Sequence, residues 1–319
     1  MRPEQILANQ AHILTQEQRE FYFDNGYLVV DSIVPTSVIE EARAVTDEMV
    51  HRSGNISKSD AIFDVEPGHS PTSPRLRRLT SPVEHHSFYW EFANGVIADV
   101  AADLVGPNVK FHHSKLNFIW SDGGEEVKWH QDIQYWPHTN YSPLTIGTYL
   151  YDVGPEQGPL GVIPKSHLGP LYNQYDDKGQ GVGCLSSADA DTLKAETTQY
   201  LTGRAGSITV HNCRAVHGSS ANLSVLGRPL LLNVYSSADA FTYTANPLPS
   251  QYEGVIVRGK PALWADHDPR PCLIPPDWSD GYTSLFALQQ EEKWDSDQLE
   301  AVTRQHYEMS NQDDNDQAR

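Results

Sequence analysis

Hydrophobic positions recur at helical spacing through the first third of the chain. The segment TQEQREFYFDN carries a capping-box pattern, Thr15 with Gln18 three residues later, and predicts a helix that ends before Gly26. The apolar run YLVV follows as a predicted strand. A second amphipathic pattern ends at Gly54, and FYWEFANGVIADVAADLVG predicts a further helical segment. We therefore expect helical support over residues 15–106.

The hydrophobic pattern then changes its period. From Val109 to about Tyr243 the chain is dominated by short runs such as VKFHHSKLNFIW, PLTIGTYLYDV, GSITVHN and RPLLLNVYSSA, separated by Gly, Pro and Asn. Runs of this kind are typical of a β-sandwich or barrel. The chain shows no internal repeat and no convincing linker, so residues 1–319 are expected to form a single catalytic domain with its β core over 107–243.

Two other stretches lack a regular pattern. Residues 53–82 are rich in Ser, Pro, Gly and charge and predict an ordered loop or a flexible lid. Residues 244–319 are Pro-rich and then polar, and they predict a C-terminal extension with a disordered tail. The loop around 171–200 and the lid are the places where we expect a substrate pocket to be shaped.

Composition narrows the class of protein. A chain of 319 residues with 39% apolar residues can bury a sizeable core, and its formal charge of −19 disfavours nucleic acid and membrane surfaces as partners. Three widely separated cysteines favour a reducing compartment, and neither a signal peptide nor a run of ~20 apolar residues is present. We expect a cytoplasmic protein; the pattern fixes no oligomeric state.

Candidate chemistry begins at KWHQDIQYW. His130 and Asp132 are two residues apart, so on a strand they point to one face and can share a metal ion, although such a pair also arises by chance. The segment HNCRAVHGSSAN offers His217 as a third ligand, with His211 as a competitor. Two imidazoles and one carboxylate on one face are the ligand set of non-haem Fe(II) oxygenases.

A candidate anchor for a cosubstrate follows on the next predicted strand. Arg228 lies in LGRPLLLNVY, and a hairpin would return its side chain to the metal end. Oxygenases that use 2-oxoglutarate need a cation for its distal carboxylate, and a planar guanidinium suits that group better than an ammonium.

These motifs together resemble one family. HQDIQYWPH, GPLGVIPKSHLG, VHGSSAN, GRPLLLNVY and the N-terminal FYFDNGYLVVD are similar to the phytanoyl-CoA dioxygenase (PhyH) family of Fe(II)- and 2-oxoglutarate-dependent oxygenases, over nearly the whole chain. The resemblance implies a mainly β fold with helical support, whose core is a cupin-like double-stranded β-helix, or jelly-roll. It implies iron held by His130, Asp132 and His217, with Arg228 as the 2-oxoglutarate anchor.

The resemblance also implies an activity and further contacts. The expected reaction uses Fe(II), 2-oxoglutarate and O2 to hydroxylate an unactivated C–H bond of a small-molecule metabolite or natural-product intermediate. Ser219, Lys115, Asn117 and Tyr149 stand where the family has additional 2-oxoglutarate contacts. His211 is then expected to be a structural neighbour.

Other aromatic and histidine residues have plainer interpretations. Trp129, Tyr135 and Trp136 could line a pocket, but packing in the core is favoured. The pair His112-His113 is adjacent on a predicted strand, so its rings are expected on opposite faces and unable to chelate together.

The sequence motifs by themselves leave two other functions open. A cupin-like metal-dependent binding protein or isomerase would need no oxygen chemistry, and a catalytically silent relative would keep only the fold. Arg228 argues against both, and the carboxylate of Asp132 argues against a halogenase.

The size of the substrate is the remaining question. The net charge offers little to hold the phosphates of coenzyme A, so we expect a small free metabolite. The basic run PRLRRL could contradict this, but Arg75, Arg77 and Arg78 are expected to pair with local acids such as Asp64 and Glu66.

Overall fold

The protein is described from a computed structural model that covers residues 1–120, 126–176, 181–275, 285–289 and 298. Its α-helices are α1 Pro3–Leu7, α2 Gln16–Asn25, α3 Thr36–Ser53, α4 Ser87–Ala93, α5 Val96–Val105, α6 Ser187–Ala190 and α7 Leu285–Gln289. Its strands are β1 Tyr27–Val30, β2 Phe63–Val65, β3 Leu76–Thr80, β4 Val109–Asn117, β5 Val127–His130, β6 Leu144–Tyr149, β7 Leu160–Val162, β8 Gln199–Leu201, β9 Ile208–Asn212, β10 His217–Ser219, β11 Leu230–Ser237 and β12 Ile256–Arg258. Short 3-10 turns lie at Pro82–Glu84, Asp132–Gln134, Pro155–Gln157, Ser166–Leu168 and Ala195–Thr197.

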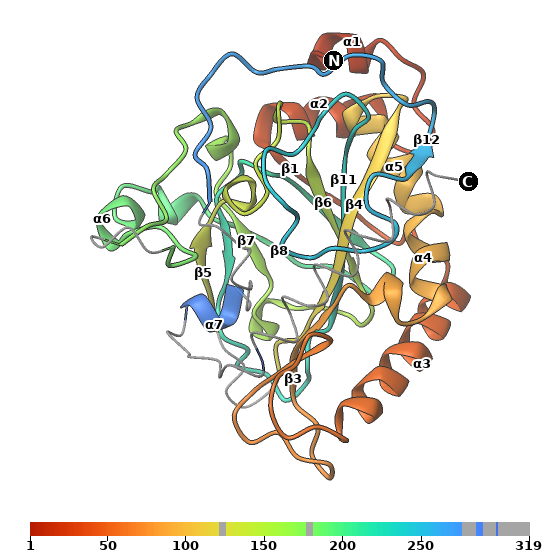
Figure 1. Cartoon of the computed structure of the whole chain (residues 1–319), viewed down its shortest axis with the longest axis vertical. Coiled ribbons are helices and arrows are strands. Elements are labelled where there is room, and N and C mark those ends of the chain that lie inside the picture. The colour runs from red at the N-terminus through yellow and green to blue at the C-terminus, as the bar shows by residue number, and fades with distance from the viewer. Residues whose placement is uncertain (121–125, 177–180, 276–284, 290–297, 299–319) are drawn as a thin grey trace.

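The strands form two antiparallel sheets. The larger sheet has the order β1-β9-β6-β11-β4-β3-β2, with β12 paired to β4, and the smaller one has the order β5-β10-β7-β8. Figure 1 shows the smaller sheet beside the larger, with α3, α4 and α5 on the far side of the larger sheet. Strands that are distant in sequence are neighbours in both sheets. This arrangement confirms the predicted double-stranded β-helix with helical support.

The main core lies between the larger sheet and the helices. Buried side chains of α3 and α5 pack with those of β4, β6, β9 and β11, among them Ile39, Met49, Ile97, Phe111, Leu116, Ile146, Val210 and Leu231. Burying such side chains contributes roughly 1.5–3 kcal/mol each. The apolar core therefore lies on the helix side of the larger sheet. The other face of that sheet, which is turned toward the smaller sheet, can carry polar groups.

The N-terminal helices follow their predicted signals, with one difference. Thr15 Oγ1 accepts from Gln18 N, and Gly26 ends α2 in a left-handed conformation at φ 81°. The segment predicted as one helix up to Gly106 is broken into α4 and α5. Gly95 interrupts it with a non-helical ψ of −143°, and α5 begins immediately after it.

A bulge in β4 decides which side chains face the interior. Val234 pairs with His113 and Tyr235 pairs with Phe111, so His112 is an extra residue in the ladder. Before the bulge, Val109 and Phe111 pack in the helix-side core. Because one inserted residue reverses the alternation, the odd-numbered residues after it turn to the space between the sheets.

That bulge corrects the expectation for His112 and His113. Their rings do not lie on opposite faces: the ring centroids are 4.8 Å apart and the two Nδ1 atoms are 2.5 Å apart. The alternation rule fails here because it holds only for an uninterrupted ladder.

Two stretches expected to be irregular contain regular structure. Within 53–82, β2 and β3 extend the larger sheet, with Arg78 paired to Asn117 across β3 and β4. Within 244–319, β12 pairs with β4, and α7 packs against the smaller sheet, where Gln289 Oε1 accepts from Lys128 N at 2.9 Å. The predicted disordered tail lies outside the described residues.

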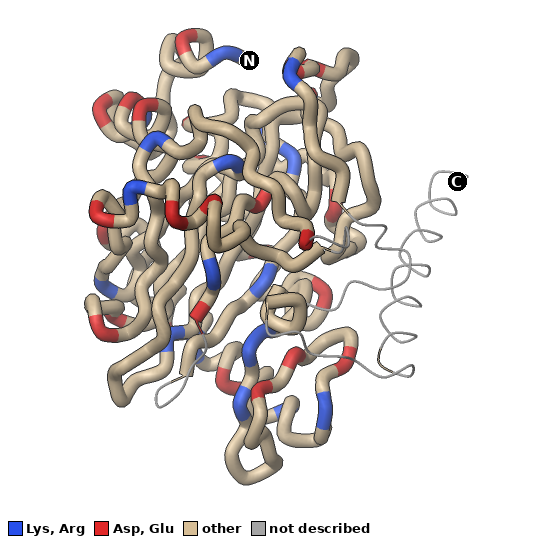
Figure 2. Tube along the Cα trace, turned by 90° about the vertical axis from the view of Figure 1, so that its left-hand side faces the viewer, with Lys and Arg blue, Asp and Glu red and all other residues tan. Residues whose placement is uncertain are grey.

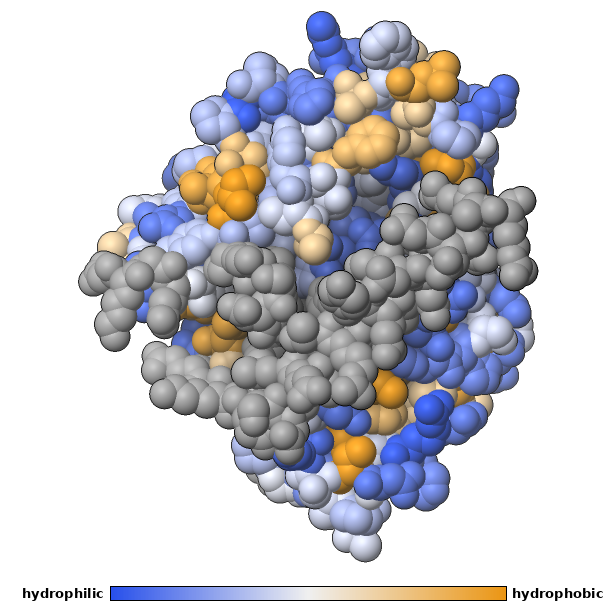
Figure 3. All heavy atoms as spheres, viewed as in Figure 1, coloured by the Kyte–Doolittle hydropathy of each residue, from blue (hydrophilic) through white to orange (hydrophobic). Residues whose placement is uncertain are grey.

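The surface is mixed in character. Figure 2 shows Lys and Arg positions distributed among Asp and Glu positions along the trace, and Figure 3 shows small apolar groups among hydrophilic side chains on the face viewed. None of the described helices is long and apolar enough to cross a bilayer.

Candidate active site

Three predicted ligands meet at one end of the smaller sheet. His130 ends β5, His217 begins β10, and the two residues are paired across the ladder with ring centroids 4.1 Å apart. Asp132 follows on a 3-10 turn, and its Oδ1 lies 3.8 Å from Nε2 of each histidine. Two ligand atoms each ~2.1 Å from a common ion are at most ~4.2 Å apart, so these separations fit one bound metal. The three ligand atoms all lie within 4.8 Å of one another.

Backbone carbonyls set the tautomer of both histidines. His130 Nδ1 lies 2.8 Å from the Lys128 carbonyl, and His217 Nδ1 lies 2.9 Å from the Ala215 carbonyl. A carbonyl only accepts, so each Nδ1 carries the hydrogen and donates it. Each Nε2 therefore presents a lone pair toward Asp132, which is the arrangement that a metal-binding imidazole requires.

Electrostatics keep the ligand set ready for a cation. Burial lowers the pKa of His130 to about 4 and that of His217 well below its ordinary value, so both rings are neutral near pH 7. Burial alone raises the pKa of Asp132, but nearby cationic charge outweighs it and holds that pKa well below normal. With both ligand histidines neutral, we assign this effect to Lys115, whose Nζ lies 4.0 Å from Asp132 Oδ1.

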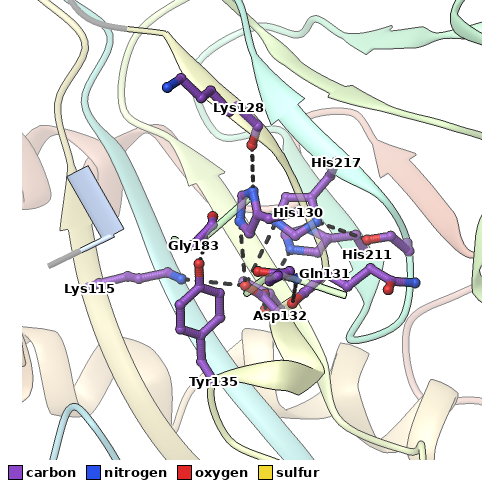
Figure 4. Close-up of polar contacts among 12 residues, drawn as sticks. Lys115, Lys128, His130, Gln131, Asp132, Tyr135, Gly183, His211 and His217 are labelled. Carbon is purple, nitrogen blue, oxygen red and sulfur yellow. Dashed lines mark hydrogen bonds and ion pairs between the residues drawn. The ribbon is translucent and has the colours of Figure 1, made fainter. Parts of the chain in front are cut away.

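His211 holds the other carboxylate oxygen. Its Nε2 lies 3.3 Å from Asp132 Oδ2, and Thr145 Oγ1 donates to the same oxygen at 2.9 Å. Figure 4 shows Lys115, His130, His211 and His217 around Asp132. His211 is thus placed to orient the carboxylate, as expected of a neighbour of the ligand set. Thr145 was not singled out from the sequence, although its register opposite His211 on β6 and β9 is what brings it here.

A cavity runs from the histidines to the predicted anchor. It has room for about 40 Å³ between the sheets, with His130 and His217 among its lining residues together with Ser219 and Arg228. Arg228 is 3% exposed, and its Nη2 donates to Ser219 Oγ at 3.4 Å. Within the part of the chain that is described, Arg228 Nε and Nη1 have no hydrogen-bond partner. A buried guanidinium with two unused donors fits a carboxylate ligand.

Of the other three residues predicted to contact 2-oxoglutarate, two line this cavity and one does not. Lys115 and Asn117 line this cavity from β4. Tyr149 is buried beside it, but its hydroxyl donates to the Leu201 carbonyl and it is absent from the cavity lining. The donor set and the two unused nitrogens of Arg228 therefore match a metal ion and a dicarboxylate, with Lys115 and Asn117 between them.

A second, adjoining cavity shares Lys115 and Asn117 with the first. It has room for about 20 Å³, and Asp132, Arg78, His113, Tyr135 and Trp136 also form its walls. Tyr135 and Trp136 thus pack in a core cluster and also line a pocket, so both interpretations of these aromatic residues hold. Arg78 and His113 were not predicted as pocket residues. The bulge at His112 gives no sequence signal.

The segment α7 closes both cavities. Leu285 and Phe286 line each of them, and Gln289 Nε2 donates to the Gly183 carbonyl at 2.7 Å. Sequence reasoning placed this segment in an irregular extension. A larger hollow lies elsewhere, between the N-terminal residues and 264–270, but none of the three ligands lines it.

Comparison with known proteins bears on this site. The sequence profile of the family described as "Phytanoyl-CoA dioxygenase (PhyH)" matches residues 22–229, a span that includes the ligand set and Arg228.

Individual relatives are similar over most of their length. A protein of Stutzerimonas stutzeri named "Probable alpha-ketoglutarate-dependent hypophosphite dioxygenase" is 29% identical over 271 residues, covering 82% of this chain and 92% of the relative. An ectoine dioxygenase of S. stutzeri strain A1501 is 24% identical over 241 residues, covering 71% and 78%. The crystal structure of EctD from S. alaskensis with bound Fe superposes with a TM-score of 0.60 at 21% identity, covering 84% of this chain and 93% of that one. This last likeness shows a shared fold.

Proposed function

This chain belongs to the phytanoyl-CoA dioxygenase family and is an Fe(II)- and 2-oxoglutarate-dependent dioxygenase, and on that premise we propose that it hydroxylates a small substrate that carries no coenzyme A. His130, Asp132 and His217 hold the iron, and Arg228 holds the distal carboxylate of 2-oxoglutarate. The observation that supports this site most strongly is that Arg228 Nε and Nη1 have no hydrogen-bond partner among the described residues, in the cavity that both histidines also line.

The iron and 2-oxoglutarate supply the oxidising chemistry when bound: one O2, one 2-oxoglutarate and one C–H bond give succinate, CO2 and one C–OH group. The chain's own residues supply binding and orientation. His130, Asp132 and His217 would hold the iron and leave further coordination positions for 2-oxoglutarate and O2. Arg228 and Ser219 fix the far end of the cosubstrate, which sets the orientation of its keto acid end.

Lys115 and Asn117 lie where the two cavities meet. We assign them to the cosubstrate's near end, where an ammonium and an amide can donate to its oxygens. Leu285 and Phe286 restrict entry of water from one side. Exclusion of water strengthens these polar contacts, because the effective dielectric falls.

The size of the substrate follows from the second cavity and from charge. With room for about 20 Å³, this cavity is far smaller than ordinary ligand pockets, which argues against a bulky substrate such as an acyl-CoA. Of the basic run, Arg75 pairs with Glu66 at 2.9 Å and Arg77 lies 3.7 Å from Asp64, as expected for those two arginines. Hypophosphite and ectoine, the molecules named for two relatives, are both small.

Succinate release tests this proposal. Phytanoyl-CoA and shorter acyl-CoAs are compared with a panel of amino acids, betaines and small anions, each with Fe(II), 2-oxoglutarate and O2. We expect substrate-dependent succinate only in the panel. Efficient hydroxylation of an acyl-CoA, lost in Arg77→Ala, would show that the basic run binds a phosphate and that the substrate assignment is wrong.

A further inference from the structure

The geometry points to a small anionic substrate, whose negative group is held by Arg78 and His113 in the cavity beside Asp132. This inference rests on the proposed function and deepens it: it names the chemical class that the cavity selects. The carrier of the charge is an oxyanion, either a carboxylate, a sulfonate or an oxyanion of phosphorus, since all three accept from a guanidinium in the same way.

The basic run PRLRRL separates into two structural roles. Arg75 donates from Nε and Nη2 to Glu66 Oε2, and Arg77 lies against Asp64. Arg78 lies on the wall of the cavity that Asp132 also lines. Because adjacent residues on a strand point to opposite faces, Arg78 points to this cavity and Arg77 to the other face of the sheet, where it is also buried.

Strand register places Arg78 and His113 on the same wall. Arg78 is paired with Asn117 across β3 and β4, so both side chains stand on the inner face. After the bulge at His112, His113 and Lys115 join Asn117 on that face. The wall therefore presents a guanidinium, an ammonium, an imidazole and an amide side by side.

The balance of charge on this wall favours an anion. Among the described residues that line the cavity, Asp132 is the one carboxylate, and it belongs to the metal ligand set. Arg78 is 2% exposed, so its guanidinium interacts in a poorly hydrated environment where charge complementarity matters most. The other lining residues include the apolar side chains of Trp136, Leu248 and Phe286.

His113 adds a directional contact. Its Nδ1 is 2.5 Å from His112 Nδ1, and two neutral rings in this contact share a single hydrogen. Its Nε2 is buried and, among the described residues, has no hydrogen-bond partner. When His112 donates, His113 Nε2 carries a hydrogen and donates into the cavity, which suits an oxyanion oxygen.

Calorimetric titration of the Fe(II)- and 2-oxoglutarate-loaded protein without O2 tests the inference. The probes are acetate, methanesulfonate, hypophosphite and methylphosphonate, each at millimolar concentration, with acetamide and dimethyl sulfone as neutral counterparts. The probes are titrated into wild type, Arg78→Met, Arg78→Lys and Arg75→Ala. Arg75→Ala is the matched control, because it removes a neighbouring arginine outside the cavity.

We expect saturable binding of at least one anion and of neither neutral compound. Arg78→Met should weaken that binding about ten- to hundredfold, because charge-assisted hydrogen bonds are lost, and Arg78→Lys should weaken it less. Arg75→Ala should bind as wild type does. The anion that binds identifies which of the three sources the site accepts.

Three results would overturn the inference: no anion binds, the neutral compounds bind equally well, or Arg78→Met keeps the wild-type affinity. The 2-oxoglutarate titration that precedes the probes separates this failure from a failure of the proposed function. If the Fe(II)-loaded wild type does not bind 2-oxoglutarate, the proposed function is wrong. If it does, and each variant does as well, the fold is intact and a negative probe result refutes only the anionic substrate.

Discussion

His211 Nε2 lies 3.3 Å from Asp132 Oδ2, whereas His217 Nε2 lies 3.8 Å from Asp132 Oδ1. The two histidines therefore contact different oxygens of one carboxylate, and only Oδ1 also faces His130. On this difference we propose that His217 binds the metal and that His211 orients its carboxylate ligand.

Replacing each of these two histidines gives different expected outcomes. His217→Ala and Asp132→Ala should abolish Fe(II) binding and succinate formation, because each removes one of three ligands. His211→Ala should keep a measurable iron site and lose roughly 10–100-fold in metal affinity or activity, as for other partners of metal ligands. Iron titrations with circular dichroism as the check on fold distinguish them. Full iron affinity in His217→Ala with loss in His211→Ala would reverse the two roles.

Arg228→Lys should weaken the binding of 2-oxoglutarate about ten- to hundredfold while iron affinity stays unchanged. Lysine keeps the positive charge but cannot donate through a planar fork, and the loss corresponds to roughly 1.5–3 kcal/mol. Titration of the Fe(II)-loaded variant with 2-oxoglutarate measures this. A variant that loses iron but retains its cosubstrate affinity would show that Arg228 belongs to the metal centre instead.

Ser219→Ala should have a smaller effect on the same titration. Ser219 Oγ accepts from Arg228 Nη2 at 3.4 Å, a long bond between a cation and a neutral hydroxyl. Loss of an ordinary hydrogen bond costs ~0.5–1.5 kcal/mol, which is about a two- to tenfold loss of cosubstrate affinity. An effect as large as that of Arg228→Lys would mean that the hydroxyl is itself a principal anchor.

The metal-free protein should lose stability as the pH falls from about 6.5 to 4. Burial lowers the pKa of His138 to about 4, with Lys110 lowering it further and the Trp136 carbonyl opposing the shift. Above pH 6.5 the ring is neutral in both states, so it contributes no pH dependence there. Below pH 6.5 the His138 ring is protonated in the unfolded chain but stays neutral in the folded chain. The free energy of unfolding therefore falls by on the order of 3 kcal/mol by pH 4.

Urea unfolding at a series of pH values measures that loss. His138→Gln should show a shallower fall in the free energy of unfolding over this range than wild type. An equal slope in both proteins would mean that His138 titrates normally in the folded state.

Local sequence signals predicted much of this architecture, for physical reasons that can be named. Thr15 and Gln18 cap the first turn of α2, and Gly26 ends its last turn. Each of these effects is local, so the sequence pattern predicts it. The ligand set was accessible because His130 and Asp132 are two residues apart and the resemblance supplied His217. Asn94-Gly95 also carried a visible stop signal, but the apolar residues on both sides hid the break between α4 and α5.

The second cavity could not be predicted in the same way. Arg77 and Arg78 are adjacent arginines and both are buried, and only the register of β3 on β4 places Arg78 rather than Arg77 at the cavity. The inward turn of His113 depends on the bulge at His112, which exists because β11 pairs with β4 in that register. Both facts are properties of long-range pairing. The position of α7 over the site is likewise set by tertiary contacts, such as Gln289 with Lys128.

The most direct test of the account is the visible absorption of the protein with Fe(II) and 2-oxoglutarate in the absence of O2. A metal-to-ligand charge-transfer band arises only when one site holds both the iron and the chelating keto acid. We predict this band for wild type, none for His217→Ala, and for Arg228→Lys the same band at higher 2-oxoglutarate concentration. Absence of the band in wild type, or its persistence at full strength in His217→Ala, would contradict the assignment of His130, Asp132 and His217 as the iron site.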